Sequence, residues 1–227
     1  MSSPALPGLA DLAWPDVQEG ATVLVPLGST EQHGPHLPLN TDTVIATAVA
    51  RGLAPLVDGL VAPAVPVGAS GEHQAFPGTV SIGVEVLTAV LVELGRSLTT
   101  WAGRVVLVNG HGGNLAAVRA AVALLREEGR TVDWVPCAVA GADAHAGHTE
   151  TSVMLHLDPA RVRTDLVERG NVAPIEQLLP VLRGQGVRGT AANGVLGDPT
   201  GATAEQGAEI LGAMVRNAHD RLAVGVR

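Results

Sequence analysis

Short apolar runs alternate along the chain with longer segments in which apolar residues recur at helical spacing. The runs predict strands at residues 22–27, 60–67, 104–109 and 132–138. The longer segments predict helices at residues 42–56, 84–101, 115–128, 149–157 and 204–222. Regular alternation of this kind predicts an α/β fold, a three-layer α/β/α sandwich with a mainly parallel central sheet.

Local signals mark several boundaries of these elements. Asn114 stands where a cap is expected for the helix at 115–128, and Gly129 stands where that helix should stop. Thr203 and Gln206 form the pattern of a capping box before the last helix. Small residues and glycines between positions 184 and 201 predict a long loop.

Composition narrows the possible functions. The chain has 227 residues, which fits a single domain over residues 1–227, and a formal net charge of −8. It contains no lysine and only 2% aromatic residues, so binding of nucleic acid is not expected. No apolar stretch is long enough to cross a membrane, and the start of the chain has no basic leader, so we expect a cytoplasmic protein. The single cysteine, Cys137, follows a strand-like run and is interpreted as a core thiol.

Polar residues cluster directly after the first predicted strand. Glu31 and His33 are two residues apart on extended chain, so their side chains project to one side. Asp42 stands at the start of the next helix, close enough in sequence for the loop to return it to that pair. Two carboxylates and an imidazole after a strand indicate a hydrolytic metal centre.

Two further clusters follow later strands. His111 lies among glycines in Gly110–Asn114, and Glu150 lies in the first turn of a helix. The glycine spacing matches neither a dinucleotide-binding loop nor a P-loop, and the chain has no lysine to serve one. Alone, His111 could be a structural turn residue, and Glu150 could simply complement the helix dipole. Together with the first cluster they favour one shared site, because ligands bind at the carboxyl ends of strands in open α/β sheets.

Charge balance favours two ions in this site. Glu31, Asp42 and Glu150 bring three negative charges, and His33 and His111 bind metals as neutral imidazoles. Two divalent cations with one hydroxide would neutralise them, and Asp42 would bridge the pair. Mixed nitrogen and oxygen ligands suit Zn, Fe or Mn without choosing among them.

The same residues resemble the creatininase family of amidohydrolases. The resemblance rests on the stretches Glu31–Pro38, Asn109–Asn114 and His145–Ser152, with Asp42 between the first two, and it extends over about residues 20 to 215. It implies a dinuclear metal site that hydrolyses C–N bonds. One metal would take Glu31, Asp42 and His111, and the other would take His33, Asp42 and Glu150.

The resemblance also implies roles for residues near the metals. His145 matches a proton-transfer histidine, which would donate a proton to the leaving nitrogen; the alternative is a hydrogen-bond partner of a ligand carboxylate. Substrate contacts are expected from Ser70, His73, Gly112, Gly113 and His148. The alternative for the loop that carries Ser70 and His73 is a contact between subunits. Family members commonly form rings of subunits, so a homo-oligomer, a hexamer or larger ring, is expected.

Two departures from creatininase itself bear on the substrate. Creatininase has a glutamate where this chain has Gly113, and aromatic residues where the segment around His145 has none. Within the family the chain is most similar to the mycofactocin-system branch, whose members release a modified C-terminal dipeptide from a precursor peptide. We therefore predict a metal-dependent peptidase. The alternatives are a hydrolase of small cyclic amides or formamides and a metal-binding module without catalysis.

Overall fold

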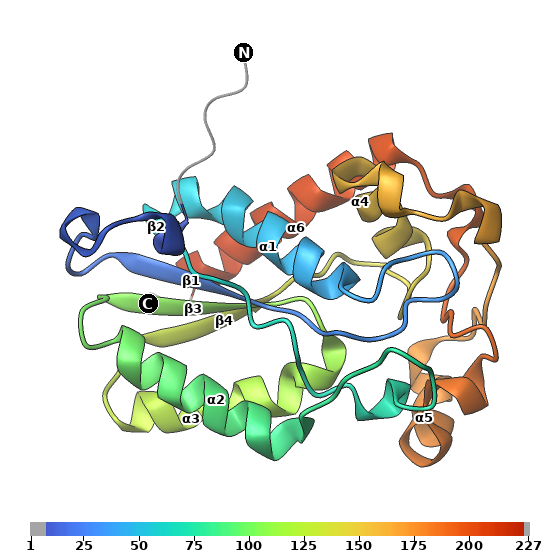
Figure 1. Ribbon diagram of the computed structural model, residues 1–227, viewed down its shortest axis with the longest axis horizontal. Coiled ribbons are helices and arrows are strands. Elements are labelled where there is room, and N and C mark those ends of the chain that lie inside the picture. Colours follow the sequence, from blue (N-terminus) through green and yellow to red (C-terminus); the bar gives the residue numbers. More distant parts are fainter. Residues whose placement is uncertain (1–7, 225–227) are drawn as a thin grey trace.

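A parallel sheet forms the centre of the molecule (Figure 1). The computed structural model describes residues 8–224, and within them four strands pair in the order β2–β1–β3–β4. These strands are β1 (Thr22–Leu27), β2 (Gly59–Val61), β3 (Arg104–Asn109) and β4 (Val132–Pro136). Leu27 of β1 lies opposite Asn109 of β3, and Asn109 lies opposite Pro136 of β4. The three strands therefore end together, and the loops that follow them leave the sheet at one edge.

Helices cover both faces of the sheet, which confirms the predicted sandwich (Figure 1). Helices α2 (Gly83–Leu98) and α3 (Leu115–Glu127) pack on one face. Helices α1 (Thr41–Leu53), α4 (His148–Leu157) and α6 (Ala204–Val224) lie on the other side, and α5 (Ile175–Thr190) lies beyond the carboxyl ends of the strands. No helix in residues 8–224 combines the length and the apolar character that a membrane span requires.

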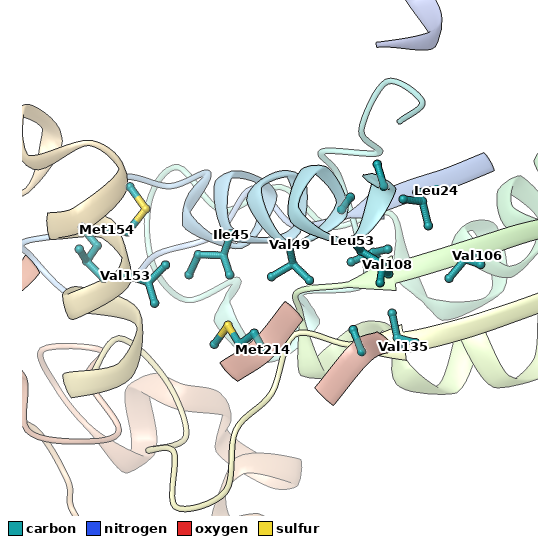
Figure 2. Close-up of a cluster of buried hydrophobic side chains, with 14 of the residues drawn as sticks. Leu24, Ile45, Val49, Leu53, Val106, Val108, Val135, Val153, Met154 and Met214 are labelled. Atoms are coloured by element: carbon teal, nitrogen blue, oxygen red, sulfur yellow. The ribbon is translucent and has the colours of Figure 1, made fainter. Parts of the chain in front are cut away.

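Two apolar cores hold these layers together. On one face, strand residues such as Leu24 and Val106 meet Ile45, Val49 and Leu53 on a single side of α1 (Figure 2). Alternate strand residues point to the opposite face, where a second core forms against α2 and α3. Because both faces are covered, β1 and β3 carry uninterrupted apolar runs at residues 23–27 and 105–108. Burial of one such leucine or valine stabilises the fold by about 1.5–3 kcal/mol.

The second strand is much shorter than predicted. Only Gly59–Val61 pairs as a strand, and Val65 contributes an isolated bridge to Leu27. Pro63 and Pro66 interrupt the apolar run, and proline cannot donate a main-chain hydrogen bond to a neighbouring strand. The prediction for residues 62–67 was therefore wrong, whereas β1 and β3 have the predicted bounds.

The predicted loop at 184–201 was wrong in its first part. Helix α5 covers Ile175–Thr190, and only the residues after it are irregular. Pro180 and the glycines at 184 and 186 hide the helical pattern. Gly186 has φ 65° and ψ −173°, so the helix is kinked there.

Asn114 does not cap α3 through its side chain, contrary to the prediction. Its Oδ1 accepts a hydrogen bond from the main-chain N–H of Ala69 at 2.9 Å, and its Nδ2 donates to the carbonyl of Gly28 at 3.0 Å. The residue ties three loops together at the edge of the sheet where the polar clusters lie.

Of the other two boundary signals, Gly129 acts as expected, and the capping box is represented by one of its two hydrogen bonds. Thr203 Oγ1 accepts a hydrogen bond from the main-chain N–H of Gln206 at 3.2 Å, at the start of α6. Gly129 follows the end of α3 with φ 78°, a conformation that glycine adopts without strain.

Candidate metal centre

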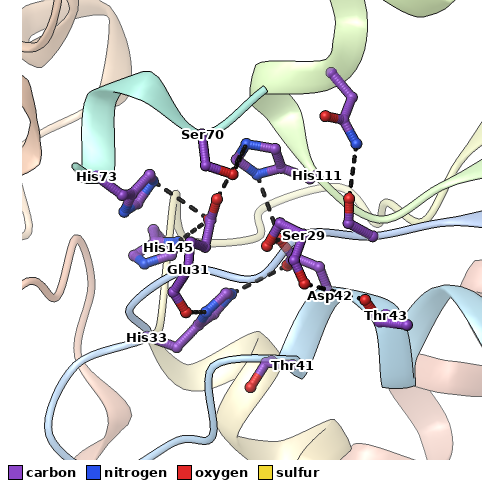
Figure 3. A network of polar contacts seen from close by, with 12 residues as sticks. Ser29, Glu31, His33, Thr41, Asp42, Thr43, Ser70, His73, His111 and His145 are labelled. Carbon is purple, nitrogen blue, oxygen red and sulfur yellow. Dashed lines mark hydrogen bonds and ion pairs between the residues drawn. The ribbon is translucent and has the colours of Figure 1, made fainter. Parts of the chain in front are cut away.

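The polar residues that follow β1, β3 and β4 converge at the carboxyl edge of the sheet (Figure 3). Glu31 and His33 lie in the loop after β1, and Asp42 lies in the first turn of α1. His111 follows β3, and Glu150 lies in the first turn of α4. Because β1, β3 and β4 end at the same level of the sheet, these segments, which are distant in sequence, lie close together, as the sequence predicted.

Glu31 is fully buried, and neither of its carboxylate oxygens has a hydrogen-bond partner. His111 Nε2 lies 3.2 Å from Oε2, and His73 Nε2 lies 3.3 Å from Oε1. A buried carboxylate without hydrogen bonds is costly unless a cation neutralises it. The buried carboxylate of Glu31 therefore fits the role of a metal ligand.

Asp42 stands between two histidines. Its Oδ1 lies 3.1 Å from His33 Nε2, and its Oδ2 lies 3.3 Å from His111 Nδ1. The hydroxyl of Ser29 donates to Oδ2 at 2.7 Å and fixes the orientation of the carboxylate. Each oxygen faces a different imidazole, which is the arrangement expected of a ligand shared by two ions.

Three groups of side chains could each hold a metal ion, because the atoms that would bind it all lie within 4.8 Å of one another. The first group is the predicted ligand set Glu31, Asp42 and His111. The second contains His33 and Glu150, as predicted, but has His145 in the position assigned to Asp42. The third joins Glu31 to His73 and His145.

Electrostatics divides the cluster into groups that hold a proton and groups that do not. Burial alone would lower the pKa of His33 and raise that of Asp42. The attraction between the two outweighs both effects: the pKa of His33 rises to about 10, and that of Asp42 falls well below its usual value. Burial likewise opposes protonation of His111, but Glu31 and Asp42 raise its pKa to about 9. Without metal, protons on these imidazoles supply the positive charge that cations would bring.

Burial is the main influence on the two glutamates. It raises the pKa of Glu31 and that of Glu150 to about 7. His111 opposes the shift at Glu31, and His33 opposes it at Glu150. Bound cations would reverse both shifts, because a metal ligand must be deprotonated.

Asp143, which sequence reasoning missed, orients the helix that carries Glu150. Its carboxylate accepts hydrogen bonds from the main-chain N–H groups of His148 and, at 3.1 Å, of Thr149. The N–H of Ala146 donates to Glu150 Oε2 at 2.6 Å, and Ala146 adopts φ 51° to do so. A carboxylate a few residues before a helix was the signal that could have revealed this cap.

The family model described as "Creatininase: Creatinine amidohydrolase" matches residues 10–222. The chain belongs to the creatininase family. It is therefore an enzyme, a metal amidohydrolase, and the alternative of a metal-binding module without catalysis does not hold.

Several relatives in the creatininase family resemble the chain over most of its length. The mycofactocin precursor peptide peptidase of Mycolicibacterium smegmatis is 58% identical over 206 residues, which cover 88% of this chain and 83% of the relative. The creatinine amidohydrolase of Pseudomonas putida is 31% identical over an alignment of 251 positions, which covers 94% of this chain and 95% of the relative. A solved structure entitled "Creatininase Mn" matches with a TM-score of 0.77 and 27% identity over 94% of this chain and 96% of the other.

The position at which creatininase has a glutamate is closed to side chains here. A Cβ atom on Gly113 would lie 2.4 Å from the carbonyl oxygen of Ala69 and 2.6 Å from Glu72 Oε1. Glu72, which was not among the predicted site residues, thus brings a carboxylate to this space, with Oε1 3.5 Å from His111 Nε2. Its neighbour His73 was the available signal, because the two share one short helical turn, Gly71–His73.

A cavity of about 1100 Å³ opens beside the metal-ligand candidates of this creatininase-family chain. Asp42, His111, His145 and Glu150 reach it from the loops and helix starts at the carboxyl ends of the strands, and Ile175, Leu179 and Leu182 of α5 form an apolar wall. Arg183 lies on the same helix. The cavity therefore combines a polar floor of ligand groups with an apolar side.

The residues predicted to contact substrate fall into two groups. His73, Gly112 and Gly113 line the cavity. Ser70 is fully buried, with its hydroxyl 3.5 Å from His111 Nε2, and His148 begins α4; neither is among the described residues that line the cavity. Cys137 packs against the first core, as expected of a core thiol, and also borders the cavity.

Proposed function

We propose that the enzyme is a peptidase that uses two divalent cations, Zn, Fe or Mn, to release the modified C-terminal dipeptide from the mycofactocin precursor peptide. The observation that carries this proposal is the identity of more than half of the aligned residues with a peptidase of that name. The buried ligand groups support the hydrolytic chemistry, and the size of the cavity supports a peptide substrate.

The cavity favours a peptide over a small cyclic amide. About 1100 Å³ exceeds what a single small ring fills, and one wall consists of apolar side chains from a helix. The closed position at Gly113 and the carboxylate of Glu72 beside it also differ from the glutamate arrangement that creatininase has at this point.

Glu31, Asp42 and His111 would hold one cation, and His33, Asp42 and Glu150 the other. Cations bound there activate water as a nucleophile at neutral pH and polarise the carbonyl of the scissile amide. The ligand set remains a prediction, and His145 competes with Asp42 for the second position in the metal-free geometry.

His145 would move the proton. Its Nε2 lies 2.8 Å from the main-chain carbonyl of Gln32, so that nitrogen carries a hydrogen and holds the ring in place. Burial lowers the pKa of His145 well below its usual value, so Nδ1 is free to accept a proton from the attacking water. From Nδ1 the proton passes to the leaving nitrogen, because an amine leaves poorly as an anion.

The decisive test is hydrolysis of the modified precursor peptide, with the released dipeptide detected by mass spectrometry. We expect release by the metal-loaded enzyme, loss after chelation and recovery when Zn, Fe or Mn is restored. His145→Gln should lower kcat by about 100-fold or more without loss of metal. The same change at His156, an exposed residue of α4, is the matched control. Release that continues unchanged after complete removal of metal would reject the proposal.

A second candidate, hydrolysis of a small cyclic amide, is favoured by the similarity to the creatinine amidohydrolase of Pseudomonas putida. A panel of creatinine and related lactams, assayed with the same metal-loaded enzyme, separates the two. Turnover of a lactam with a higher kcat/KM than the peptide would replace the peptidase assignment.

A further inference from the structure

Gln32 lies between the ligand candidates Glu31 and His33, yet its side chain faces the other way. It is 5% exposed. Its amide instead lies against His73, His145 and the chain at Gly194. A buried primary amide in contact with two histidines of the site calls for an account of each of its hydrogen bonds.

A main-chain donor settles which end of the amide faces which neighbour. The N–H of Gly34 lies 2.9 Å from the Gln32 side chain, and a main-chain N–H can only donate. The atom it meets must be Oε1, so the NH₂ group points the other way, 2.9 Å from His73 Nδ1 and 3.1 Å from the carbonyl oxygen of Gly194.

The two amide hydrogens can then be assigned. His145 Nε2 is itself a donor, because it lies 2.8 Å from the main-chain carbonyl of Gln32, which can only accept. Its 3.0 Å approach to Gln32 Nε2 is therefore a contact between two donors. The hydrogens of Gln32 go to Gly194 and to His73 Nδ1, so His73 Nδ1 is an acceptor and a neutral His73 carries its hydrogen on Nε2.

We propose that Gln32 is a positioning residue that holds His73 in its Nε2-protonated form, so that His73 turns an N–H group, and not a lone pair, toward Glu31 and the cavity. His73 Nε2 lies 3.3 Å from Glu31 Oε1, and His73 lines the cavity. His145 is held in the same tautomer by the Gln32 carbonyl, but it turns its lone pair at Nδ1 toward Glu31 Oε1, at 3.8 Å. Through its side chain and its carbonyl, Gln32 thus makes His73 face Glu31 with an N–H group and His145 face it with a lone pair.

This arrangement excludes the third group of potential ligands as a metal site. Glu31, His73 and His145 lie close enough to hold an ion, but a protonated Nε2 on His73 has no lone pair to offer. Metals are then confined to the groups that contain Asp42 or Glu150. The link to catalysis rests on the proposed peptidase function, whereas the hydrogen-bond assignment does not.

Nitrogen-15 NMR of the histidine side chains in the metal-free protein tests the assignment without any assay of activity. His73 is identified by the signals that disappear in His73→Gln. We expect hydrogen on Nε2 of neutral His73 in the wild type, and on Nδ1 in Gln32→Glu, whose carboxylate can only accept. Gln32→Met should leave a mixture of the two tautomers, and Gln18→Met, at an exposed glutamine, should match the wild type.

In peptide hydrolysis, Gln32→Met should lower kcat by about 10- to 100-fold, with KM within about twofold and metal content unchanged. A wild-type His73 with hydrogen on Nδ1, or a Gln32→Met spectrum with the wild-type tautomer, would overturn the proposal. The wild-type spectrum decides the question even if a variant fails to fold. If the enzyme does not cleave the peptide, the peptidase function fails while the spectra still test the role of Gln32.

Discussion

At the residue scale, the two buried carboxylates Glu31 and Asp42 differ in how the fold stabilises their charge. Asp42 accepts a hydrogen bond from Ser29. Burial opposes its ionisation, but His33 and His111 on either side lower its pKa well below the usual value. Glu31 has no hydrogen-bond partner, and burial raises its pKa to about 7. Glu31 is therefore the group whose ionised state depends most on a bound cation.

Glu31→Gln should have opposite effects on the metal-free and the metal-loaded protein. Metal affinity should fall by more than about 10-fold, because the charge that attracts the ion is lost. The metal-free protein should be more stable by about 1–3 kcal/mol, because an unsatisfied buried carboxylate is removed. Isothermal titration and urea denaturation in chelator measure the two effects. Glu209→Gln, at an exposed glutamate of α6, should change neither, and a destabilised metal-free Glu31→Gln would contradict the prediction.

At the scale of elements, two helices place the groups that surround the cavity. Helix α5 contributes the apolar wall and meets the turn that carries Glu72 and His73. Helix α4 carries Glu150, and its first main-chain N–H groups are satisfied by Asp143, which lies outside the helix. The position of each helix thus depends on a contact that can be changed without touching a ligand.

Gly186→Ala should displace α5. Gly186 has φ 65°, and an added Cβ would lie 2.6 Å from the carbonyl oxygen of Glu72. We expect a loss of about 1–3 kcal/mol in the free energy of unfolding and a higher KM for peptide, because the apolar wall moves. Gly184→Ala is the matched control: its Cβ would meet nothing within 4 Å, and it should stabilise the protein by up to about 1 kcal/mol. Equal effects of the two changes would argue against a specific contact at Gly186.

Asp143→Ala should weaken the start of α4. Removal of the carboxylate leaves the N–H groups of His148 and Thr149 without their acceptor, at a cost of about 1–2 kcal/mol. Because Glu150 lies in that turn, metal affinity at its site should also fall. Asp143→Asn keeps one acceptor oxygen and should retain most of the stability in thermal denaturation. An Asn variant as unstable as the Ala variant would show that charge, and not capping, is what matters.

At the scale of the whole molecule, one parallel sheet collects ionisable groups from residues 31 to 150 at a single buried edge. The stability of the fold and the binding of metal are therefore linked through the same protons. The family resemblance also implies that whole molecules assemble into a homo-oligomeric ring, which remains a prediction.

Without metal, the free energy of unfolding should fall as the pH rises. The folded-state pKa of His33 is about 10 and that of His111 about 9, both above the 6.5 of a free histidine. Their contribution is complete below pH 6.5 and is lost as the pH rises through 9 and 10. Each retained proton corresponds to a slope of about 1.4 kcal/mol per pH unit within that window.

Bound metal should make the free energy of unfolding rise with pH instead. Neutral imidazoles bind cations more tightly than protonated ones, and a cation that binds only the native state stabilises that state. Urea denaturation at pH 6.5 and 9, in chelator and in excess Mn²⁺, measures both slopes. His33→Asn should reduce the dependence in chelator, and His156→Asn, at an exposed position, should not. A metal-free protein that becomes more stable toward pH 9 would contradict the assignment of these protons.

The sequence by itself determined the sandwich, the strands β1 and β3, and the convergence of Glu31, His33, Asp42, His111 and Glu150. Strands that are apolar on both sides require a sheet with both faces covered. Neighbouring parallel strands that end at the same level bring the loops after them close together. Only the tertiary structure showed helix α5, which Pro180 and its glycines disguise, and the contacts made by Gln32, Glu72 and Asp143. Gln32 and Glu72 act through contacts between segments far apart in the chain, about which local spacing carries no information, whereas the cap at Asp143 is local and could have been found from a carboxylate before a helix.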